Sequence, residues 1–484
     1  MRTGPQPGPQ PGPQPGPQAG PQAGPQGGPQ AGSQSGAQAG PQSGAQAGPQ
    51  SGSRGGLQAG PQGGFRATPG GGPGGGRGGR CDIAVTGLGL VTAAGTGVAA
   101  NWARVKAAEP TAATDPRLAG LLVDIACPVT GFDPDRELGR RTAWRLDRYV
   151  QLALVAAREA LRDSGLDPQA WDGGRVGVVL GNALGGTATY EAQTRNLIQD
   201  GPDQVSPMLV PMAAINMVSG QVAMDCGARG PNLVTATACA SGTTAIGTAR
   251  DLLRSGACDV VITGGTEASL TPAIVSGFAR MGALSRRSGD PAGASRPFDA
   301  GRDGFVIAEG AGVLVLERLT DARARGARVR ACLSGYGASA DAYHATAPDP
   351  EGTGAQQAIV AALADAGVGP DEIDHVNAHG TSTPLNDVIE ARVLNRVLGW
   401  RAAVTSTKGV TGHCLGAAGA IEAAYTVLAI ENALVPPTAN LDSLDAAIDI
   451  DVVTKAPREM CIEAAMSNSF GFGGQNAVLI FTKP

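Results

Sequence analysis

The first 80 residues of this 484-residue chain lack most of the side chains that build a folded core. They contain no Val, Ile, Trp, Tyr, Asp, Glu, Lys or Cys, whereas 27 of them are Gly and 15 are Pro. Such a segment buries too little apolar surface to offset the loss of chain entropy on folding. We therefore expect residues 1–80 to be a disordered tail and linker, followed by a folded unit.

The tail also lacks the repeat of a structural fibre. From Pro5 to Gly64 it repeats a four-residue x-Gln-x-Gly unit fifteen times, with Arg54 in place of one Gln. Collagen needs Gly at every third position, so this period excludes a triple helix. The composition favours a flexible spacer with some polyproline II character over a specific docking segment.

The remaining 404 residues lack a basic domain. The tail carries five Arg and no acid, so the formal charge of −5 for the whole chain becomes −10 for the part after residue 80. Nucleic-acid binders are expected to carry a basic face, which makes a nucleic-acid partner unlikely for this chain. No apolar run approaches the roughly 20 residues that cross a bilayer, and no apolar secretion signal follows Met1. We expect a cytoplasmic protein without a membrane partner.

The eight cysteines lack the spacing of a metal site or a disulfide framework, because no CxxC pair occurs among them. This pattern predicts reduced thiols. None of the Gly-rich turns has the GxGxxG form that opens a nucleotide-binding helix. The sequence therefore predicts no metal and no bound cofactor.

What the chain does contain is an alternation of short β-branched runs with Ala- and Leu-rich helical stretches, typical of a layered α/β protein. Each of two series opens with a strand that runs into an expected Gly-X-Gly turn, at residues 87–89 and 335–337. This parallel suggests two related halves, residues 81–328 and 329–484. Strands are expected at 82–89, 176–181, 233–237, 259–264, 312–316, 329–335, 375–378, 404–407, 464–467 and 477–481, and helices at 149–164, 243–254, 354–366, 387–398 and 417–431.

Cys239 is the first candidate for chemistry. It lies among small residues in the segment TATACASG (235–242), between an expected buried strand and the helix that follows. A helix N-terminus favours a thiolate through its dipole and free N–H groups, and small neighbours leave room for a bulky acyl group. The alternative is one more buried thiol among eight.

Two of the four histidines follow strand ends in loops rich in Gly and hydroxyl residues, His379 in NAHGTSTP and His413 in STKGVTGH. Such positions serve site chemistry more often than packing. His375 lies inside an expected strand and is interpreted as structural, and His344 is a minor candidate for a site mouth. Lys408 and Glu422 are a possible buried ion pair beside His413 or, alternatively, unrelated surface charges.

The Gly-rich segment NSFGFGG (468–474) follows an expected strand and holds two aromatic residues. This composition suits a loop that bends sharply and moves, although a plain tight connection is the alternative.

These segments together resemble the β-ketoacyl-acyl-carrier-protein synthases of the elongating type, above all synthase II, and the related ketosynthase subunits of type II polyketide systems. Over residues 82–483 the resemblance rests on five motifs in order: TATACASG (235–242), RPFDAGRDGFV (296–306), NAHGTSTPLND (377–387), STKGVTGHCLGAAGAIE (406–422) and SNSFGFGGQN (467–476). It implies a thiolase-like fold, with the halves packed as one layered αβαβα unit.

The resemblance also implies roles for individual residues. Cys239 would take the acyl chain from a carrier-protein thioester, and His379 and His413 would stabilise the enolate formed when malonyl-carrier protein loses CO2. The backbone N–H groups of Cys239 and Phe472 match an oxyanion hole. The supporting residues implied in the same way are the Lys408–Glu422 pair, Phe472 as a gate, Thr381 and Thr383 for the phosphopantetheine arm, and Leu184, Met208, Leu209 and Phe470 for the acyl pocket and its surroundings.

The implied partners are an acyl carrier protein, which brings the substrates on its phosphopantetheine arm, and a second subunit. That subunit is a second copy of the chain or a chain-length-factor-like protein. An acidic carrier helix would suit a basic patch formed by Arg140, Arg141 and Arg145, with Arg286 and Arg287 as further candidates. Three functions stay open: fatty-acid elongation, a type II polyketide or polyene pathway, and a non-catalytic scaffold subunit, against which the intact Cys239, His379 and His413 argue.

Overall fold

The computed structural model describes Met1, Gly4 and residues 81–484. The predictions for the tail and its repeat lie outside these residues. None of the helices in the described part of the chain is both long and apolar enough to cross a bilayer.

The core of the fold is one large sheet whose strand order is β11-β10-β14-β15-β9-β1-β8-β7-β5-β6, with the short β2 paired to β1. The strands at both ends are parallel to their neighbours, and the strands in the middle are antiparallel. The bounds are β1 Ile83–Thr92, β2 Gly95–Thr96, β5 Val176–Gly181, β6 Asn232–Thr235, β7 Val260–Glu267, β8 Gly310–Arg318, β9 Ala331–Ala340, β10 His375–Asn377, β11 Ala403–Thr405, β14 Ala464–Gly471 and β15 Gln475–Thr482.

The sheet is built from two halves with corresponding strand orders. Reading outward from the centre, β1-β8-β7-β5-β6 on one side corresponds to β9-β15-β14-β10-β11 on the other. The halves are joined where β1 pairs with β9 over two residue pairs, Ala84 with Cys332 and Val85 with Ala331. This arrangement agrees with the expected thiolase-like fold.

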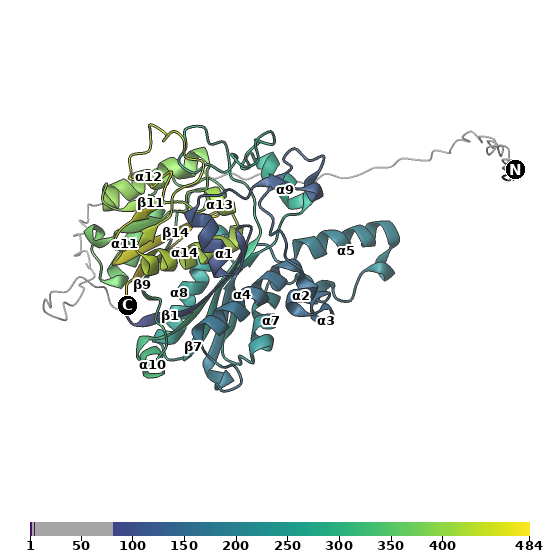
Figure 1. The fold of residues 1–484 in the computed structure, drawn as a ribbon, viewed down its shortest axis with the longest axis horizontal. Coiled ribbons are helices and arrows are strands. Elements are labelled where there is room, and N and C mark those ends of the chain that lie inside the picture. Colours follow the sequence, from purple (N-terminus) through teal and green to yellow (C-terminus); the bar gives the residue numbers. More distant parts are fainter. Residues whose placement is uncertain (2–3, 5–80) are drawn as a thin grey trace, which may run out of the picture. The chain divides into compact units, whose positions relative to one another are not determined.

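Helices form three layers around the two halves (Figure 1). Helix α4 packs on β1 and β8, and α11 packs on β9 and β15. Helices α8 and α14 contact each other; α8 packs mainly on β7 and β5 of the first half, whereas α14 contacts β8 of the first half as well as β14 of the second. Helices α8 and α14 both contribute to the largest apolar cluster, which explains why α14 is buried on nearly all sides. The longer helices are α1 Val98–Lys106, α4 Arg148–Ser164, α5 Thr187–Asp200, α7 Met217–Cys226, α8 Ser241–Arg254, α9 Pro272–Met281, α11 Thr353–Ala366, α12 Pro384–Leu398 and α14 Ala418–Asn432.

The two Gly-X-Gly segments are not turns, so that prediction is wrong. Residues 87–89 lie inside β1 and residues 335–337 lie inside β9. A Cβ atom on Gly89 would overlap a backbone carbonyl oxygen of α4, and one on Gly337 would overlap a backbone carbonyl oxygen of α11. The glycines therefore let a helix pack directly against the equivalent strand of each half.

The prediction that all cysteines are reduced is wrong for two of them. Cys81 and Cys332 form a disulfide across a sequence separation of 251 residues, with a Cα–Cα distance of 5.3 Å. The reason is the strand pairing, because Ala84 of β1 lies opposite Cys332 of β9 and so brings Cys81 close to it. The other six cysteines are free thiols, and only Cys461 among them is exposed.

Candidate active site

Cys239 lies in a tight turn between β6 and α8. Residues 238–240 form one turn of 3-10 helix, and α8 begins at Ser241. The turn is held by Ser241, whose hydroxyl accepts a hydrogen bond from the Thr237 N–H (2.9 Å) and donates one to the Ala238 carbonyl (2.7 Å). Ala238 has a left-handed φ of 48°, a backbone conformation that costs free energy and clusters at functional sites. This geometry presents the thiol at the start of the helix, as the sequence predicts.

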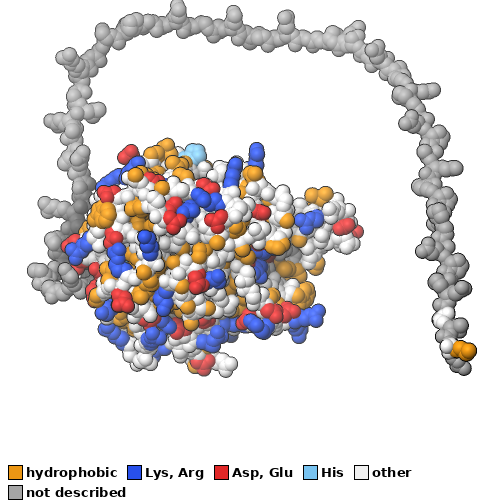
Figure 2. Space-filling model, turned by 45° about the horizontal axis from the view of Figure 1, so that its top comes forward, with side chains coloured by type: hydrophobic (Ala, Val, Ile, Leu, Met, Phe, Trp, Pro, Cys, Tyr) orange, Lys and Arg blue, Asp and Glu red, His pale blue; other side chains and the backbone are white. Residues whose placement is uncertain are grey.

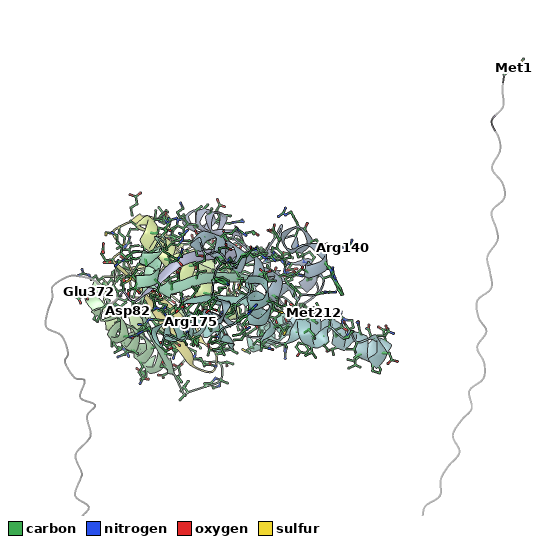
Figure 3. All side chains as sticks on the ribbon, turned by 90° about the horizontal axis from the view of Figure 1, so that it is seen from below. Met1, Asp82, Arg140, Arg175, Met212 and Glu372 are labelled. Carbon is green, nitrogen blue, oxygen red and sulfur yellow. A yellow bond between two sulfur atoms is a disulfide. The ribbon has the colours of Figure 1, made fainter. Side chains whose placement is uncertain are left out.

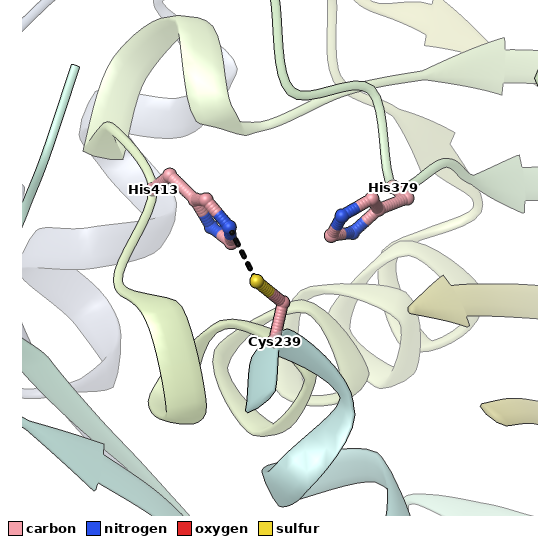
Figure 4. Close-up of side chains that lie close together, drawn as sticks. All are labelled: Cys239, His379 and His413. Atoms are coloured by element: carbon pink, nitrogen blue, oxygen red, sulfur yellow. Dashed lines mark hydrogen bonds between the residues drawn. The ribbon is translucent and has the colours of Figure 1, made fainter. Parts of the chain in front are cut away.

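Two imidazoles converge on this thiol (Figure 4). The Nε2 atom of His413 lies 3.1 Å from the Sγ atom of Cys239, and the His379 and His413 ring centroids are 5.5 Å apart. Ligand-type atoms of the three residues all lie within 4.8 Å of one another, and all three side chains are buried. Segments that are far apart in the sequence thus meet at one point.

A buried carboxylate positions the His379 loop. Glu390 of α12 accepts hydrogen bonds from the backbone N–H groups of His379 (2.8 Å) and Gly380 (2.7 Å), and from the Asn468 side chain (3.1 Å). Burial raises the pKa of Glu390. The sequence analysis did not single out Glu390. Its spacing from His379 gave no signal, because α12 folds back over the loop only in three dimensions.

Lys408 and Glu422 form the buried ion pair that was one of two interpretations of the sequence. Both side chains are at most 3% exposed, and the ammonium group also donates to the His379 carbonyl over 2.6 Å. Burial raises the pKa of Glu422 to about 7, although the charge of Lys408 and the hydrogen bond from it oppose the rise. The pair therefore ties α14 to the His379 loop.

Burial, not the helix terminus, dominates the charge state of the thiol. It raises the pKa of Cys239 to about 11, against the lowering effects of Lys408 and of a hydrogen bond with the Phe472 backbone. Burial therefore opposes the effect expected from the helix terminus. Burial and the Lys408 charge also hold the pKa values of His379 and His413 well below 6.5. At neutral pH the site holds a thiol and two neutral imidazoles.

The three residues line a cavity of about 580 Å³. Among the residues singled out from the sequence, those that also line it are Leu184, Thr381, Thr383, Phe470 and Phe472. The Thr381 and Thr383 hydroxyls are hydrogen-bonded to each other at 2.9 Å. A cavity of this volume holds a ligand of drug or acyl-chain size.

The Gly-rich segment is a strand end followed by a tight hairpin. The strand β14 continues to Gly471, and β15 begins at Gln475. A Cβ atom on Gly471 would lie 2.8 Å from the Thr237 carbonyl oxygen and 3.1 Å from the Cys239 nitrogen. The absence of a side chain at Gly471 therefore lets this hairpin approach the nucleophile closely. The structure thus has the tight connection that was the alternative interpretation.

A row of aromatic rings connects Phe472 to His413. Ring centroids are 6.3 Å apart for Phe472 and Phe278, 5.5 Å for Phe278 and Phe305, and 5.2 Å for Phe305 and His413. Phe278 and Phe305 also line the cavity, and the sequence analysis did not single them out. Only Phe305 falls within a quoted motif, so the sequence held no signal for Phe278 beyond its apolar character.

Other predicted residues lie elsewhere. Met208 and Leu209 are half-buried at the start of the short helix α6 (Leu209–Ala213) and are not among the residues that line the cavity. His375 is buried in β10 with Nδ1 2.8 Å from the Ala403 carbonyl oxygen, in agreement with a structural role. The exposed His344 accepts hydrogen bonds from the backbone N–H groups of Thr346 and Ala347, which line the cavity mouth.

The candidate docking arginines lie outside the cavity. Arg140, Arg141 and Arg145 are exposed in and just after α3 (Arg140–Ala143), and Figure 3 shows Arg140 at the opposite end of the folded part from Glu372. Arg286 is exposed, whereas Arg287 donates a hydrogen bond to the Gly301 carbonyl over 2.5 Å. On the face shown in Figure 2, basic and acidic side chains are interspersed.

The layered fold, with two halves of corresponding strand order, is that of thiolase-like enzymes. A thiol and two neutral imidazoles that line one cavity are equipped for acyl transfer. Comparison with known proteins gives the same class. Residues 80–322 match the model of the beta-ketoacyl synthase N-terminal domain, and residues 330–442 match that of the C-terminal domain. The chain therefore belongs to the β-ketoacyl synthase family and is an acyltransferase.

Individual relatives cover the whole folded part. The chain is 44% identical over 408 residues to a 3-oxoacyl-[acyl-carrier-protein] synthase 2 of Synechocystis sp.. The alignment covers 83% of this chain and 98% of the relative. The solved ishigamide ketosynthase/chain length factor matches with a TM-score of 0.78 and 34% identity, over 84% of this chain and 100% of that chain. A type II polyketide synthase acyl-carrier protein in complex with its ketosynthase bound to the hexaketide matches with a TM-score of 0.77 and 32% identity, over 83% and 99%.

Proposed function

We propose that this enzyme is an elongating β-ketoacyl-acyl-carrier-protein synthase of fatty-acid synthesis, which condenses an acyl thioester with malonyl-carrier protein. The observation that carries the proposal is the convergence of Cys239, His379 and His413 on one cavity, with the His413 Nε2 atom 3.1 Å from the thiol. The 44% identity to a 3-oxoacyl-[acyl-carrier-protein] synthase 2 supports the same activity.

In the first half-reaction the Cys239 sulfur attacks the carbonyl carbon of the incoming acyl thioester. With a pKa of about 11 the free thiol is protonated at neutral pH, so its proton must leave as the new bond forms, and His413 is within reach to accept it. The backbone N–H groups of Cys239 and Phe472 are the proposed donors to the oxyanion. The carrier's phosphopantetheine thiol receives a proton and leaves, and the acyl chain stays on Cys239.

In the second half-reaction the two imidazoles act on the malonyl thioester. Both are neutral near pH 7, so each carries one ring N–H that it can donate to the thioester oxygen, on which negative charge builds as CO2 leaves. For His413 this step uses the tautomer protonated on Nε2, whereas acceptance of the Cys239 proton uses the tautomer protonated on Nδ1. The carbanion of the resulting enolate attacks the acyl carbon on Cys239. The sulfur leaves as a thiolate and takes up a proton from solvent, and the product is a β-ketoacyl chain two carbons longer on the carrier. Lys408 and Glu422 support this step by holding the His379 loop.

The proposed partner is an acyl carrier protein that brings both substrates on its phosphopantetheine arm. Thr381 and Thr383 line the cavity and are the proposed contacts of that arm, and no bound cofactor is needed for the proposed chemistry. Exposed Arg140, Arg141 and Arg145 are the proposed docking residues, because an acidic carrier surface would be attracted to them.

We further propose a dimer of two copies of this chain or of one copy and a similar subunit. The strand β6 ends the sheet, and its first two residues are exposed, which leaves an edge available for pairing. Separately, α5 carries the exposed apolar side chains Tyr190, Leu197 and Ile198. The division of the folded part at residue 328 and the cytoplasmic location stay predictions.

A polyketide ketosynthase acting with a chain-length factor is the second candidate, and the two solved polyketide relatives favour it. The test is condensation by the full chain with malonyl-carrier protein and acyl-carrier protein of either fatty-acid or polyketide type, followed by mass spectrometry of the product chains. The first proposal predicts saturated acyl primers and turnover by the chain alone. Turnover only with a partner subunit, giving poly-β-keto chains, would favour the second candidate. No condensation under either condition would leave a scaffold role.

A further inference from the structure

We infer that Cys239, His379 and His413 also form a site for a thiophilic divalent cation, with Zn²⁺ as the best fit, and that the metal inhibits the enzyme. Among the described residues these three offer one sulfur and two imidazole ligands whose atoms all lie within 4.8 Å of one another. Zinc and cobalt bind well to thiolate and imidazole ligands, whereas magnesium and calcium prefer oxygen ligands.

The geometry requires only small side-chain movements. With usual Zn–S and Zn–N lengths, ligand atoms of a tetrahedral site are roughly 3.3–3.6 Å apart. The Sγ–Nε2 distance of 3.1 Å between Cys239 and His413 is slightly shorter than this, and the full set spans at most 4.8 Å. The longest separation must therefore shorten by up to about 1.2–1.5 Å, which side-chain rotation of the imidazoles can supply. All three residues line the cavity, so a fourth position stays open to water or another small ligand.

The surrounding protein holds the three ligand residues in place. The three side chains are at most 9% exposed, and their backbones are fixed: His379 by Glu390, His413 by strand-like hydrogen bonding to Val306. The Nδ1 atoms of both histidines are buried without a hydrogen-bond partner among the described residues. The rings are therefore free to turn without breaking a side-chain hydrogen bond at that nitrogen.

Binding is a ligand exchange that balances without a redox partner. The ion loses water molecules, the Cys239 thiol loses its proton to the buffer, and bonds form from the sulfur and two nitrogen atoms to the metal. The metal occupies the sulfur lone pair that attacks the acyl thioester, so metal binding and acylation exclude each other. This exclusion rests on the proposed function, whereas metal binding itself does not. The consequence is an enzyme that the metal inhibits when the thiol is free and spares when it is acylated.

The sequence has no closely spaced set of metal ligands, so it predicts no metal site. Here the ligands are separated by 140 and 34 positions in the chain, at 239, 379 and 413, and only the fold assembles them. The same side chains serve the proposed catalysis, so the site is one of inhibition and not of metal-assisted chemistry.

The experiment titrates ZnCl2 into the full chain in competition with a chromogenic chelator, and CoCl2 in a parallel series read by thiolate-to-cobalt charge-transfer absorption. We expect one tight equivalent per chain. Cys239→Ser, His379→Ala and His413→Ala should each weaken it by at least about tenfold, as loss of a direct ligand demands. The matched control Cys461→Ser removes the exposed free thiol and should leave the equivalent unchanged.

A second measurement needs no variant at the site. Zn²⁺ should slow alkylation of Cys239 by iodoacetamide at least about fivefold while leaving alkylation of the exposed Cys461 unchanged, as read by peptide mass spectrometry. Absence of a tight equivalent, or its persistence in folded Cys239→Ser, would overturn the inference. So would equal protection of both thiols. A failure of condensation with intact metal binding would instead count against the proposed function alone.

Discussion

At the scale of single residues, the reactivity of Cys239 depends on the protonation states of its thiol and of the two neighbouring imidazoles. Burial raises the pKa of Cys239 to about 11 and holds those of His379 and His413 well below 6.5. The thiol and the imidazoles are therefore all uncharged near pH 7. A neutral imidazole carries an N–H that can donate a hydrogen bond to the oxygen of a developing enolate.

Replacement of Lys408 by Met should be costly for both stability and activity. It leaves Glu422 buried without its cation and removes the hydrogen bond to the His379 carbonyl. We expect a loss of about 3 kcal/mol in the free energy of unfolding. Condensation should fall by more than about tenfold, because the histidine loop loses its support. Urea unfolding and a condensation assay measure the two effects.

The matched control is Arg328→Met. Arg328 also pairs with a glutamate, Glu431, but its side chain is 65% exposed. An exposed pair contributes about 0–1 kcal/mol, so this variant should behave like the parent protein. Equal losses in the two variants would contradict the role given to the buried pair.

His375 predicts a pH dependence of stability with a definite sign. Burial lowers the pKa of His375 from 6.5 to about 4, so the unfolded chain binds a proton at a higher pH than the folded chain does. Its contribution is present above pH 6.5 and is lost as the pH falls toward 4, by up to roughly 3 kcal/mol. Buried Glu267 and Glu422, with pKa values raised to about 7, act in the opposite direction between pH 7 and 4.5.

The contribution of His375 is isolated by comparison with His375→Gln, which keeps a donor for the Ala403 carbonyl. When urea unfolding is measured at pH 7.5 and pH 5, the change in the free energy of unfolding on acidification should be less unfavourable in the variant than in the parent, because Glu267 and Glu422 contribute equally to both proteins. The same loss in both proteins would show that His375 does not carry the effect.

At the scale of elements, the two halves share one construction: a glycine-bearing strand with a helix packed directly on it. A Cβ atom at position 89 would overlap the Ala156 carbonyl oxygen of α4, whereas one at Gly220 in α7 meets nothing within 4 Å. We expect Gly89→Ala to lower the free energy of unfolding by about 3 kcal/mol or more, because α4 must move away. Gly220→Ala should be neutral or stabilise by up to about 1 kcal/mol. Denaturant unfolding of both variants checks this, and similar effects would contradict the packing argument.

Some elements followed closely from the sequence, whereas the helices α1, α5, α7 and α9 were not predicted. The strand at 176–181 and the helix at 149–164 agree within a residue, because buried apolar runs and caps determine them locally. Strand lengths near the site were underestimated. The strand β14 continues through Ser469 and Phe470, residues whose composition indicated a loop. Pairing with β15 decides that extent, and no local pattern reports a neighbouring strand.

The site divides in the same way. The positions of Cys239 and His413 could be inferred from motifs, and the fold brings their atoms together. Glu390, Phe278 and the strained Ala238 could not be inferred, because their contribution depends on contacts across the fold. The effect of burial on the pKa of the Cys239 thiol could not be inferred either, since burial is a property of the assembled cavity.

At the scale of the whole molecule, the Cys81–Cys332 disulfide joins the start of β1 to β9. Closing so long a loop should stabilise the fold by roughly 2–5 kcal/mol. We expect Cys81→Ala to lower the thermal midpoint under oxidising conditions and to have no further effect once a reductant is present. Cys461→Ala, which removes an unpaired exposed thiol, is the control. An unchanged thermal midpoint for Cys81→Ala would contradict a stabilising role of the disulfide.

The tail prediction also belongs to this scale. Deletion of residues 2–80 should leave the condensation rate within about twofold of that of the full chain, because a segment without core-forming residues supplies no contact to the transition state. A much larger loss would show that the tail docks on the catalytic unit or recruits its partner.

The central claim is that the acyl chain is carried on Cys239 and passes from there into the product. The most direct test incubates the full chain with an acyl-carrier protein and locates the added mass by peptide mass spectrometry, before and after malonyl-carrier protein is added. We predict the acyl mass on the peptide containing Cys239, its disappearance on addition of the second substrate, and a product two carbons longer. An acyl group on another residue, or one that stays on Cys239 when malonyl-carrier protein is present, would contradict the account.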